Sequence, residues 1–331
     1  MPFDLTPFRG IFPAALTMFD RENNLDEEAT ARHWDWLVTQ QGVDGLVIAG
    51  TSGEFIALDR EERVRLFRLA RDVVRKRVPV IYGSGHYSTK LTIQLCEEAQ
   101  KYGADALIII LPYFQRPPKA AVIEHFRRVR QTVNLPVMLY NNPNNSACVE
   151  LSPREIARLV EEDVFHMVKS TLGSVEPVHD LHYLVGDRMA IFYGSFLAAL
   201  EGLAAGAHGW ISGVLNVVTK AAKAMHQAVV IHNDVRKGLL IWNKILSIIH
   251  IYTYQQVGPV SDLAIYRSML KFWGLPGGYC RDPFFPLDEK QEKVLHDLLH
   301  QSGWINPDHV LDSLEPSGSQ DRKGEVKPTV R

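Results

Sequence analysis

The chain has 331 residues, of which 46% are hydrophobic and 22% are charged, as in an ordinary globular protein. Its net charge of −2 argues against nucleic acid or an anionic membrane surface as a partner. No apolar run reaches the roughly 20 residues of a membrane-spanning helix, and the first residues do not have the pattern of a signal peptide. The 3 cysteines are widely spaced and fit neither a disulfide framework nor a clustered zinc site, so we expect a cytoplasmic protein.

Short apolar segments alternate with longer amphipathic ones through the first two thirds of the chain. Residues 106–111 are apolar throughout, which is typical of a parallel strand covered on both faces. The segment 59–76 instead places Leu66, Leu69 and Val73 on one face of a helix. The expected strands are residues 10–16, 44–49, 78–83, 105–111, 136–140, 164–169, 189–193 and 208–212. The expected helices between them include residues 26–41, 59–76, 89–102, 119–132 and 152–161.

These strand–helix units predict an α/β fold, a (β/α)8 TIM barrel, in residues 1–218. Residues 219–314 have a helical pattern and predict a C-terminal helical extension packed on the barrel. Its expected helices are residues 219–231, 234–251, 261–274 and 288–302. Residues 315–331 are rich in Ser, Gly, Pro and charge, so we expect a disordered tail there.

Two side chains that could take part in catalysis lie at the ends of predicted strands, where TIM barrels carry their active sites. Lys169 ends an apolar strand, and loss of solvation there favours a neutral, nucleophilic amine. Tyr140 ends the preceding strand. A structural ion pair is the alternative for Lys169, and a packed tyrosine with a satisfied hydroxyl is the alternative for Tyr140. An amine and a phenol at two strand ends indicate imine chemistry on a carbonyl substrate.

The second predicted strand is followed by Gly50-Thr51-Ser52-Gly53. The two glycines let the backbone approach a ligand closely, and the hydroxyls with adjacent amides can hold a small carboxylate. Such clusters also form ordinary turns. The position of this segment at a strand end, like those of Lys169 and Tyr140, favours a substrate site.

Together with several other short motifs, these residues resemble the dihydrodipicolinate synthase / N-acetylneuraminate lyase superfamily of class I pyruvate aldolases. The similarity extends from about residue 10 to residue 304, and its motifs follow one another in the order and spacing of that superfamily. They are Gly50-Thr51-Ser52-Gly53-Glu54, Gly83-Ser84-Gly85, Leu111-Pro112-Tyr113, Leu139-Tyr140-Asn141-Asn142-Pro143, Val168-Lys169-Ser170, Gly206-Ala207-His208-Gly209 and Arg281-Asp282-Pro283.

The resemblance implies that Lys169 forms an imine with the C2 carbonyl of pyruvate or a related 2-oxo acid. Tyr140 would then act as general acid and base, with Thr51 relaying protons. Ser52 and the backbone around Gly50 and Gly53 would bind the substrate carboxylate. The resemblance further implies a homotetramer, arranged as a dimer of dimers. No metal and no cofactor other than the covalent imine is expected.

The chain departs from the superfamily where substrate choice is set. Synthases that use aspartate semialdehyde carry an arginine at the position of Asn145, where it holds the second carboxylate. They also carry a second tyrosine where this chain has Phe114. An Asp-Asp pair common in the superfamily is replaced by Ser195-Phe196. Trp210 stands where a small aliphatic residue is usual, and it could pack in the core or line an enlarged pocket.

The sequence therefore predicts a Schiff-base lyase that makes or breaks a C–C bond between a 2-oxo acid and a sugar-acid-derived or aromatic aldehyde. Trp210, Ile211, Asn142 and Asn145 are its further candidate substrate-binding residues. The enzymatic alternatives are a keto-deoxy sugar-acid dehydratase that uses the same imine, 4-hydroxy-tetrahydrodipicolinate synthase despite the missing arginine, and a metal-dependent aldolase. The non-enzymatic alternative is a catalytically silent sensor of 2-oxo acids.

Overall fold

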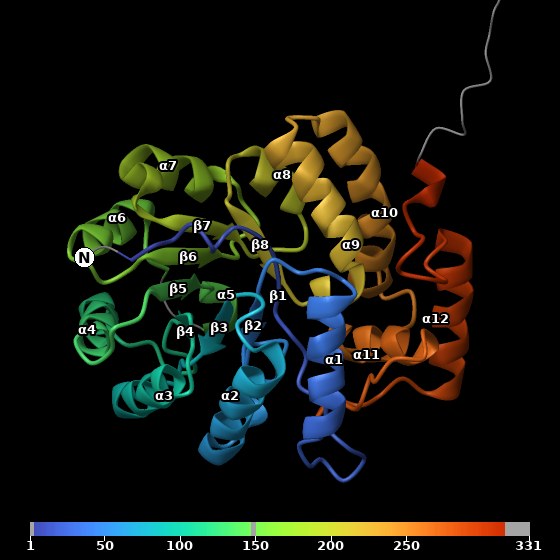
Figure 1. Cartoon of the computed structure of the whole chain (residues 1–331), viewed down its shortest axis with the longest axis horizontal. Helices are drawn as coiled ribbons and strands as arrows, with labels where there is room; N and C mark the ends of the chain where they lie inside the picture. The colour runs from blue at the N-terminus through green and yellow to red at the C-terminus, as the bar shows by residue number, and fades with distance from the viewer. Residues whose placement is uncertain (1–2, 147–149, 315–331) are drawn as a thin grey trace, which may run out of the picture.

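The computed structural model, which describes residues 3–146 and 150–314, is a closed barrel of parallel strands surrounded by helices (Figure 1). The strands are hydrogen-bonded in the order β1-β8-β7-β6-β5-β4-β3-β2. The ring closes between β1 and β2, because the amide of Ala15 donates to the carbonyl of Val47 at 2.8 Å. The predicted TIM barrel is thus confirmed. Its strands are β1 (Gly10–Pro13), β2 (Leu46–Ile48), β3 (Val80–Gly83), β4 (Ala106–Ile110), β5 (Val137–Asn141), β6 (Met167–Ser170), β7 (Ala190–Tyr193) and β8 (Gly209–Ser212).

Several helices begin where the sequence supplies a capping side chain. At the start of α2, the Asp59 carboxylate accepts a hydrogen bond from the backbone amide of Glu62. The Glu62 carboxylate in turn accepts one from the backbone amide of Asp59. Ser152 and Glu155 form the same capping box at α6. The helices of the barrel are α1 (Glu27–Thr39), α2 (Arg60–Val74), α3 (Thr89–Lys101), α4 (Lys119–Arg130), α5 (Pro143–Ser146), α6 (Pro153–Glu161), α7 (Glu176–Val185), α8 (Ala199–Ala204) and α9 (Leu215–His226).

Alternation along the strands divides the core into two layers. Met138 and Tyr140 of β5 point into the barrel, as does Met167 of β6, whereas Leu139 and Val168 pack outward against the helices. The same parity directs Lys169 inward. The strand register places Lys169 beside Tyr140 on the neighbouring strand.

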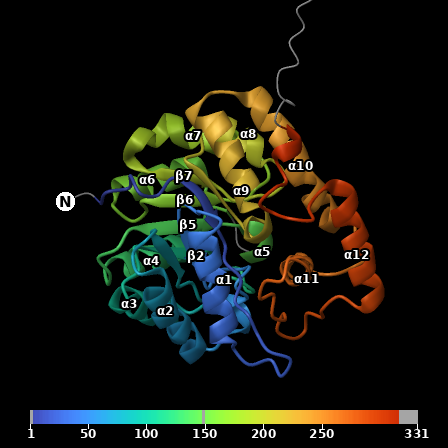
Figure 2. The same cartoon turned by 45° about the vertical axis from the view of Figure 1, so that its right-hand side comes forward.

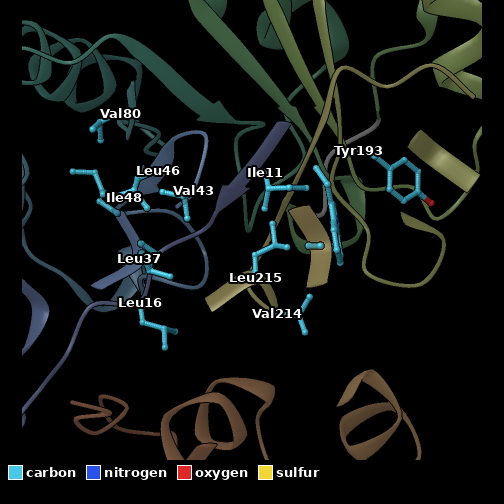
Figure 3. Packing of buried hydrophobic residues seen from close by; sticks show 14 of the residues in the cluster. Ile11, Leu16, Leu37, Val43, Leu46, Ile48, Val80, Tyr193, Val214 and Leu215 are labelled. Carbon is cyan, nitrogen blue, oxygen red and sulfur yellow. The ribbon is translucent and has the colours of Figure 1, made fainter. Parts of the chain in front are cut away.

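The outer layer of the core lies between the strands and the surrounding helices. Figure 3 shows Ile11 of β1 facing Val214 and Leu215, which lie at the start of α9. All three side chains are buried. α9 therefore covers the junction between the paired strands β1 and β8.

The C-terminal helices gather on one side of the barrel beyond α9 (Figure 1). They are α10 (Val235–Thr253), α11 (Asp262–Phe272) and α12 (Glu289–Ser302), and a π-helical segment (Gln227–Ile231) joins α9 to α10. Figure 2 shows α11 between the barrel and α12. The expected division after residue 218 falls inside α9, at Val218, whose φ of −122° and ψ of 19° are not helical. The expectation for residues 315–331 lies outside the described residues.

We find no helix in residues 3–146 and 150–314 with the length and apolar character needed to cross a bilayer.

Candidate active site

Lys169 and Tyr140 lie side by side at the C-terminal ends of β6 and β5. The Lys169 Nζ atom is 4.1 Å from the centre of the Tyr140 ring, and both side chains are buried. A third residue that the sequence singled out, Thr51, lines the same cavities as these two. The structure thus brings together three residues that are far apart in the sequence.

Hydrogen bonds and charge favour ionisation of the Tyr140 hydroxyl. Asn142 Nδ2 donates to Tyr140 Oη at 2.9 Å. Burial alone would raise the pKa of Tyr140, but the charge of Lys169 and polar contacts with Thr51, Asn142 and Lys169 outweigh it, so the pKa of Tyr140 lies below its ordinary value. A phenol with a lowered pKa next to an amine is suited to move protons at a substrate bound to that amine.

Two glycines that the sequence analysis did not single out provide the space for this arrangement. A β-carbon at Gly194, directly after β7, would lie 2.8 Å from Cγ and Cε of Lys169. A β-carbon at Gly213, directly after β8, would collide with Ser52 Oγ. The signal in the sequence was a glycine immediately following a predicted strand. Without the structure, nothing showed which neighbour each glycine accommodates.

The loop after β2 is fixed by a buried ion pair. Glu54 adopts a left-handed conformation with φ of 55°. Its carboxylate binds Arg267 of α11 at 2.5 Å, and each side chain is only 3% exposed. The backbone amide of Arg281 donates to the other Glu54 oxygen at 2.9 Å. Helix α11 and the loop that carries Thr51 and Ser52 are therefore held together.

Arg63 is a further residue near the site that the sequence analysis missed. Its guanidinium donates to the carbonyls of Gly83 and Gly85, and burial lowers its pKa to about 10. Arg63 shares with Tyr140 and Lys169 the lining of a cavity of about 20 Å³, room for roughly one water molecule. The available signal was an arginine in the apolar register of α2, three residues before Leu66.

A cleft at the barrel mouth leads to these residues and holds about 1640 Å³ of empty space, including space open to solvent. Three candidate substrate-binding residues, Ser52, Asn142 and Asn145, line it. Residues beyond the barrel form part of its wall: Tyr252, Ser261, Asp262, Leu263, Arg281, Asp282, Pro283 and Phe284. In the described part of the chain, no three His, Cys, Asp or Glu side chains gather as a metal site would require.

Four of the predicted site residues lie outside this cleft: Trp210, Ile211, Gly53 and Gly50. Trp210 is fully buried and faces outward from β8, where Nε1 donates to the Ser195 carbonyl at 3.1 Å and the ring meets Trp242 edge-on. Strand parity is the reason, because Ile211 takes the inward position next to it and fills the barrel interior. Trp210 is therefore a packing residue, which corrects its assignment as pocket lining. Gly53 lies against the backbone of Ala15 and does not line the cleft. Gly50 lines only the smaller cavity.

The closed barrel with a lysine and a tyrosine at adjacent strand ends defines a (β/α)8 enzyme with its site at the C-terminal face of the strands. The sequence profile of the Dihydrodipicolinate synthetase family matches residues 7–302. The chain belongs to this family, which confirms the resemblance, and it is a lyase.

Individual relatives agree with this assignment. The 4-hydroxy-tetrahydrodipicolinate synthase of Nitrobacter hamburgensis is 32% identical over 301 residues, which cover 91% of this chain and 99% of that protein. YagE, a prophage protein of the dihydrodipicolinic acid synthase family from E. coli K12 solved in complex with pyruvate, is 31% identical, with a TM-score of 0.82 and coverage of 89% of this chain and 99% of that one. CdNal from Clostridium difficile, solved in complex with mannosamine, is 20% identical with a TM-score of 0.83 over 89% of this chain and 99% of that one, and shares the fold.

Proposed function

We propose that this protein is a Schiff-base lyase that makes or breaks a C–C bond between pyruvate, or a related 2-oxo acid, and an aldehyde. The observation that carries the proposal is the buried Lys169 amine, 4.1 Å from the centre of the Tyr140 ring at the base of an open cleft. A nucleophilic amine and a phenol in contact are the two groups that imine formation and proton transfer require.

In the synthetic direction, the Lys169 amine attacks the C2 carbonyl of the 2-oxo acid, and the resulting carbinolamine loses water to give a protonated imine. Tyr140 removes a proton from C3, and the imine nitrogen takes up the electron pair as the enamine forms. The enamine carbon attacks the aldehyde, whose oxygen receives the proton. Water then hydrolyses the imine and releases Lys169. Cleavage follows the same steps in reverse.

The loop after β2 supplies the groups for the carboxylate of the 2-oxo acid. Ser52 lines the cleft together with Lys169, and Thr51 lies within reach of the Tyr140 hydroxyl. An anchored carboxylate holds the carbonyl carbon near the amine, which lowers the entropic part of the barrier. This reaction needs no cofactor beyond the imine itself.

The outer cleft favours an aldehyde without a second carboxylate. Arg281 lines the cleft, but its guanidinium is bound to both oxygens of Glu62, at 2.6 and 2.7 Å. Asn145 occupies the position where an arginine would hold that carboxylate. The relatives named 4-hydroxy-tetrahydrodipicolinate synthase support that activity as the second candidate, and a keto-deoxy sugar-acid dehydratase would use the same imine.

The experiment that tests the proposal is reductive trapping with pyruvate and borohydride, followed by mass spectrometry of the modified peptide. We expect the reduced pyruvate adduct on Lys169 and its loss in Lys169→Ala. Lys119→Ala, which removes a lysine paired with Glu155 at the surface, is the control and should be trapped like the wild type. If neither pyruvate nor larger 2-oxo acids modify Lys169, the imine mechanism is wrong and the sensor alternative is favoured.

We also propose that the protein is cytoplasmic and assembles as a homotetramer. Phe114 supports an assembly, because an aromatic side chain that is 88% exposed is suited to pack against another subunit. Light scattering on the purified protein would measure the mass of the assembly, and a monomer would contradict this part of the proposal.

A further inference from the structure

The wall of the cleft that lies beyond the barrel carries a carboxylate without a cationic partner. Asp262 is the first residue of α11, and its neighbours Ser261 and Leu263 line the cleft with it. Of the other two acidic residues in the lining, Glu54 is paired with Arg267. Asp282 has only a neutral partner, Asn23 Nδ2 at 2.9 Å, but it is exposed to solvent, whereas Asp262 is partly buried. Among the described residues, Asp262 forms no ion pair.

All close partners of the Asp262 carboxylate are neutral. Ser261 Oγ donates to Asp262 Oδ1 at 3.4 Å, and the nearby Tyr266 hydroxyl works to lower the pKa of the carboxyl. The Leu263 amide donates to Ser261 Oγ at 3.2 Å. Burial raises the pKa of Asp262 despite these hydrogen bonds. A partly desolvated carboxylate accepts hydrogen bonds and donates none, so a ligand next to it gains most by presenting a donor.

Asp262 is held rigidly relative to the imine site. Arg267, one turn further along α11, forms the buried pair with Glu54 and also donates to the Thr17 carbonyl at 2.7 Å. A β-carbon placed on Gly213 would lie 3.6 Å from the Tyr266 ring and 2.4 Å from Ser52 Oγ, so Gly213 lies between these two side chains. Asp262 and Tyr266 therefore lie on a helix that is fastened to the same loop that we propose binds the carboxylate of the 2-oxo acid.

We propose that Asp262 is a specificity-determining residue that accepts a hydrogen bond from a hydroxyl group of the aldehyde substrate. The aldehyde would accordingly be a neutral, hydroxylated one, and its hydroxyl would replace part of the solvation that the cleft removes from the carboxylate. The same negative charge disfavours an aldehyde that carries a second carboxylate, because like charges repel in a partly desolvated cleft. This inference rests on the proposed function and names the substrate class of that site.

The test compares three aldehydes in condensation with pyruvate: D-glyceraldehyde, propanal and succinic semialdehyde. The wild type should prefer glyceraldehyde. We expect Asp262→Ala to lower kcat/KM for glyceraldehyde by about 10- to 100-fold, the range for losing a hydrogen bond to a charged group. Propanal, which has no hydroxyl to lose, should change by less than about 3-fold. Asp262→Asn should raise the rate with succinic semialdehyde, because the amide keeps the shape and removes the charge.

Controls separate this inference from the proposed function and from a structural role. Pyruvate trapping on Lys169 should be unchanged in both Asp262 variants, so failed trapping in the wild type overturns the imine mechanism and not the role of Asp262. Asp297→Ala, at an exposed position of α12, should leave all three rates unchanged. Equal losses with all three aldehydes in Asp262→Ala would mean a merely structural role. A wild-type preference for propanal over glyceraldehyde would overturn the inference, because the exposed Ile56, Leu197 and Phe284 side chains of the cleft would then dominate recognition.

Discussion

The inner and outer parts of the active-site cleft are built in different ways. The inner part consists of Lys169, Tyr140 and the residues around them at the strand ends. The register between β5 and β6 places Tyr140 against Lys169, and Gly194 leaves room for the lysine. The outer part combines loops of the barrel with segments beyond it, to which Tyr252 and Asp262 belong. The barrel itself thus positions the groups for the chemistry, and the added segments supply part of the wall that we propose contacts the aldehyde.

The two parts also differ in how their polar atoms are satisfied. The Tyr140 hydroxyl is surrounded by Asn142, Thr51 and Lys169, so the inner site is preorganised by the protein alone. Asp262 has only neutral partners, and a ligand can contribute the missing donor. Substitutions in the inner site should therefore change the rate with every aldehyde, whereas those in the outer wall should change the choice among aldehydes.

The largest effect should follow from Tyr140→Phe, which removes the proton-transfer group and keeps the ring against Lys169. We expect kcat to fall by about 10²- to 10⁴-fold with all aldehydes, the usual contribution of general acid–base catalysis. Steady-state kinetics with two aldehydes measures this. Pyruvate should still be trapped on Lys169, though more slowly. A loss confined to one aldehyde would contradict the division between the inner and outer parts.

Breaking the link between the two parts should destabilise the protein. Arg267→Leu leaves Glu54 charged and buried without its partner, which typically costs about 3–5 kcal/mol of unfolding free energy. Urea unfolding monitored by circular dichroism measures this loss. Arg32→Ala removes an exposed ion pair with Glu28, and its effect should stay within about 1 kcal/mol. If the two variants are equally stable, the buried pair is not what fastens α11 to the β2 loop.

Gly194→Ala tests whether the glycine makes room for the reactive lysine. The added carbon would lie 2.4 Å from Thr171 Cγ2 and 2.8 Å from two Lys169 carbons, so both side chains would have to shift. A displacement of about 1 Å at a reacting group can reduce the rate by on the order of 10²-fold, and we expect a loss of that size with every aldehyde. Borohydride trapping should slow in parallel. A thermal melt shows whether the fold survives, and an unchanged trapping rate would contradict the steric argument.

The smallest expected effect is a shift in pH dependence in Asn142→Ala. Asn142 donates to the Tyr140 hydroxyl and helps to keep the pKa of Tyr140 below its ordinary value. Without this donor the pKa rises, so more alkaline solution is needed to ionise the phenol. The rising limb of kcat/KM against pH should therefore move to higher pH. Asn144→Ala is the matched control, since Asn144 lines the cleft and makes no hydrogen bond to Tyr140. If the rising limb lies at the same pH in Asn142→Ala and Asn144→Ala, the hydrogen bond from Asn142 does not lower the pKa of Tyr140.

Sequence reasoning reached the barrel and the centre of the inner site because both depend on local patterns. Strand and helix periods are local, and a lysine at the end of an apolar strand is visible without any fold. All eight predicted strands are present, although β2 is shortened to three residues because the backbone turns at Ala49, whose φ is 48°. The neighbouring strands then bring Lys169 and Tyr140 together, as the barrel topology requires.

The remaining features depend on contacts between distant segments. Glu54 and Arg267 are separated by 213 residues, and nothing in the sequence around either one indicates the other. Asp262 looks like an ordinary helix N-terminal acid until the fold places it on the cleft wall. Trp210 was a candidate for the cleft or for the core, and strand parity, which the sequence did contain, directs it into the packing against α10.

Helix α11 has a consequence for how this enzyme could diverge. The groups proposed to form the imine come from β5, β6 and the β2 loop, whereas α11 lies beyond the eighth strand, near the end of the described chain. Under the proposal for Asp262, part of the recognition of the aldehyde is encoded in a later stretch of the gene than the groups for the imine. Mutation or exchange of the later stretch could give the barrel a new aldehyde partner while the inherited reaction stays intact.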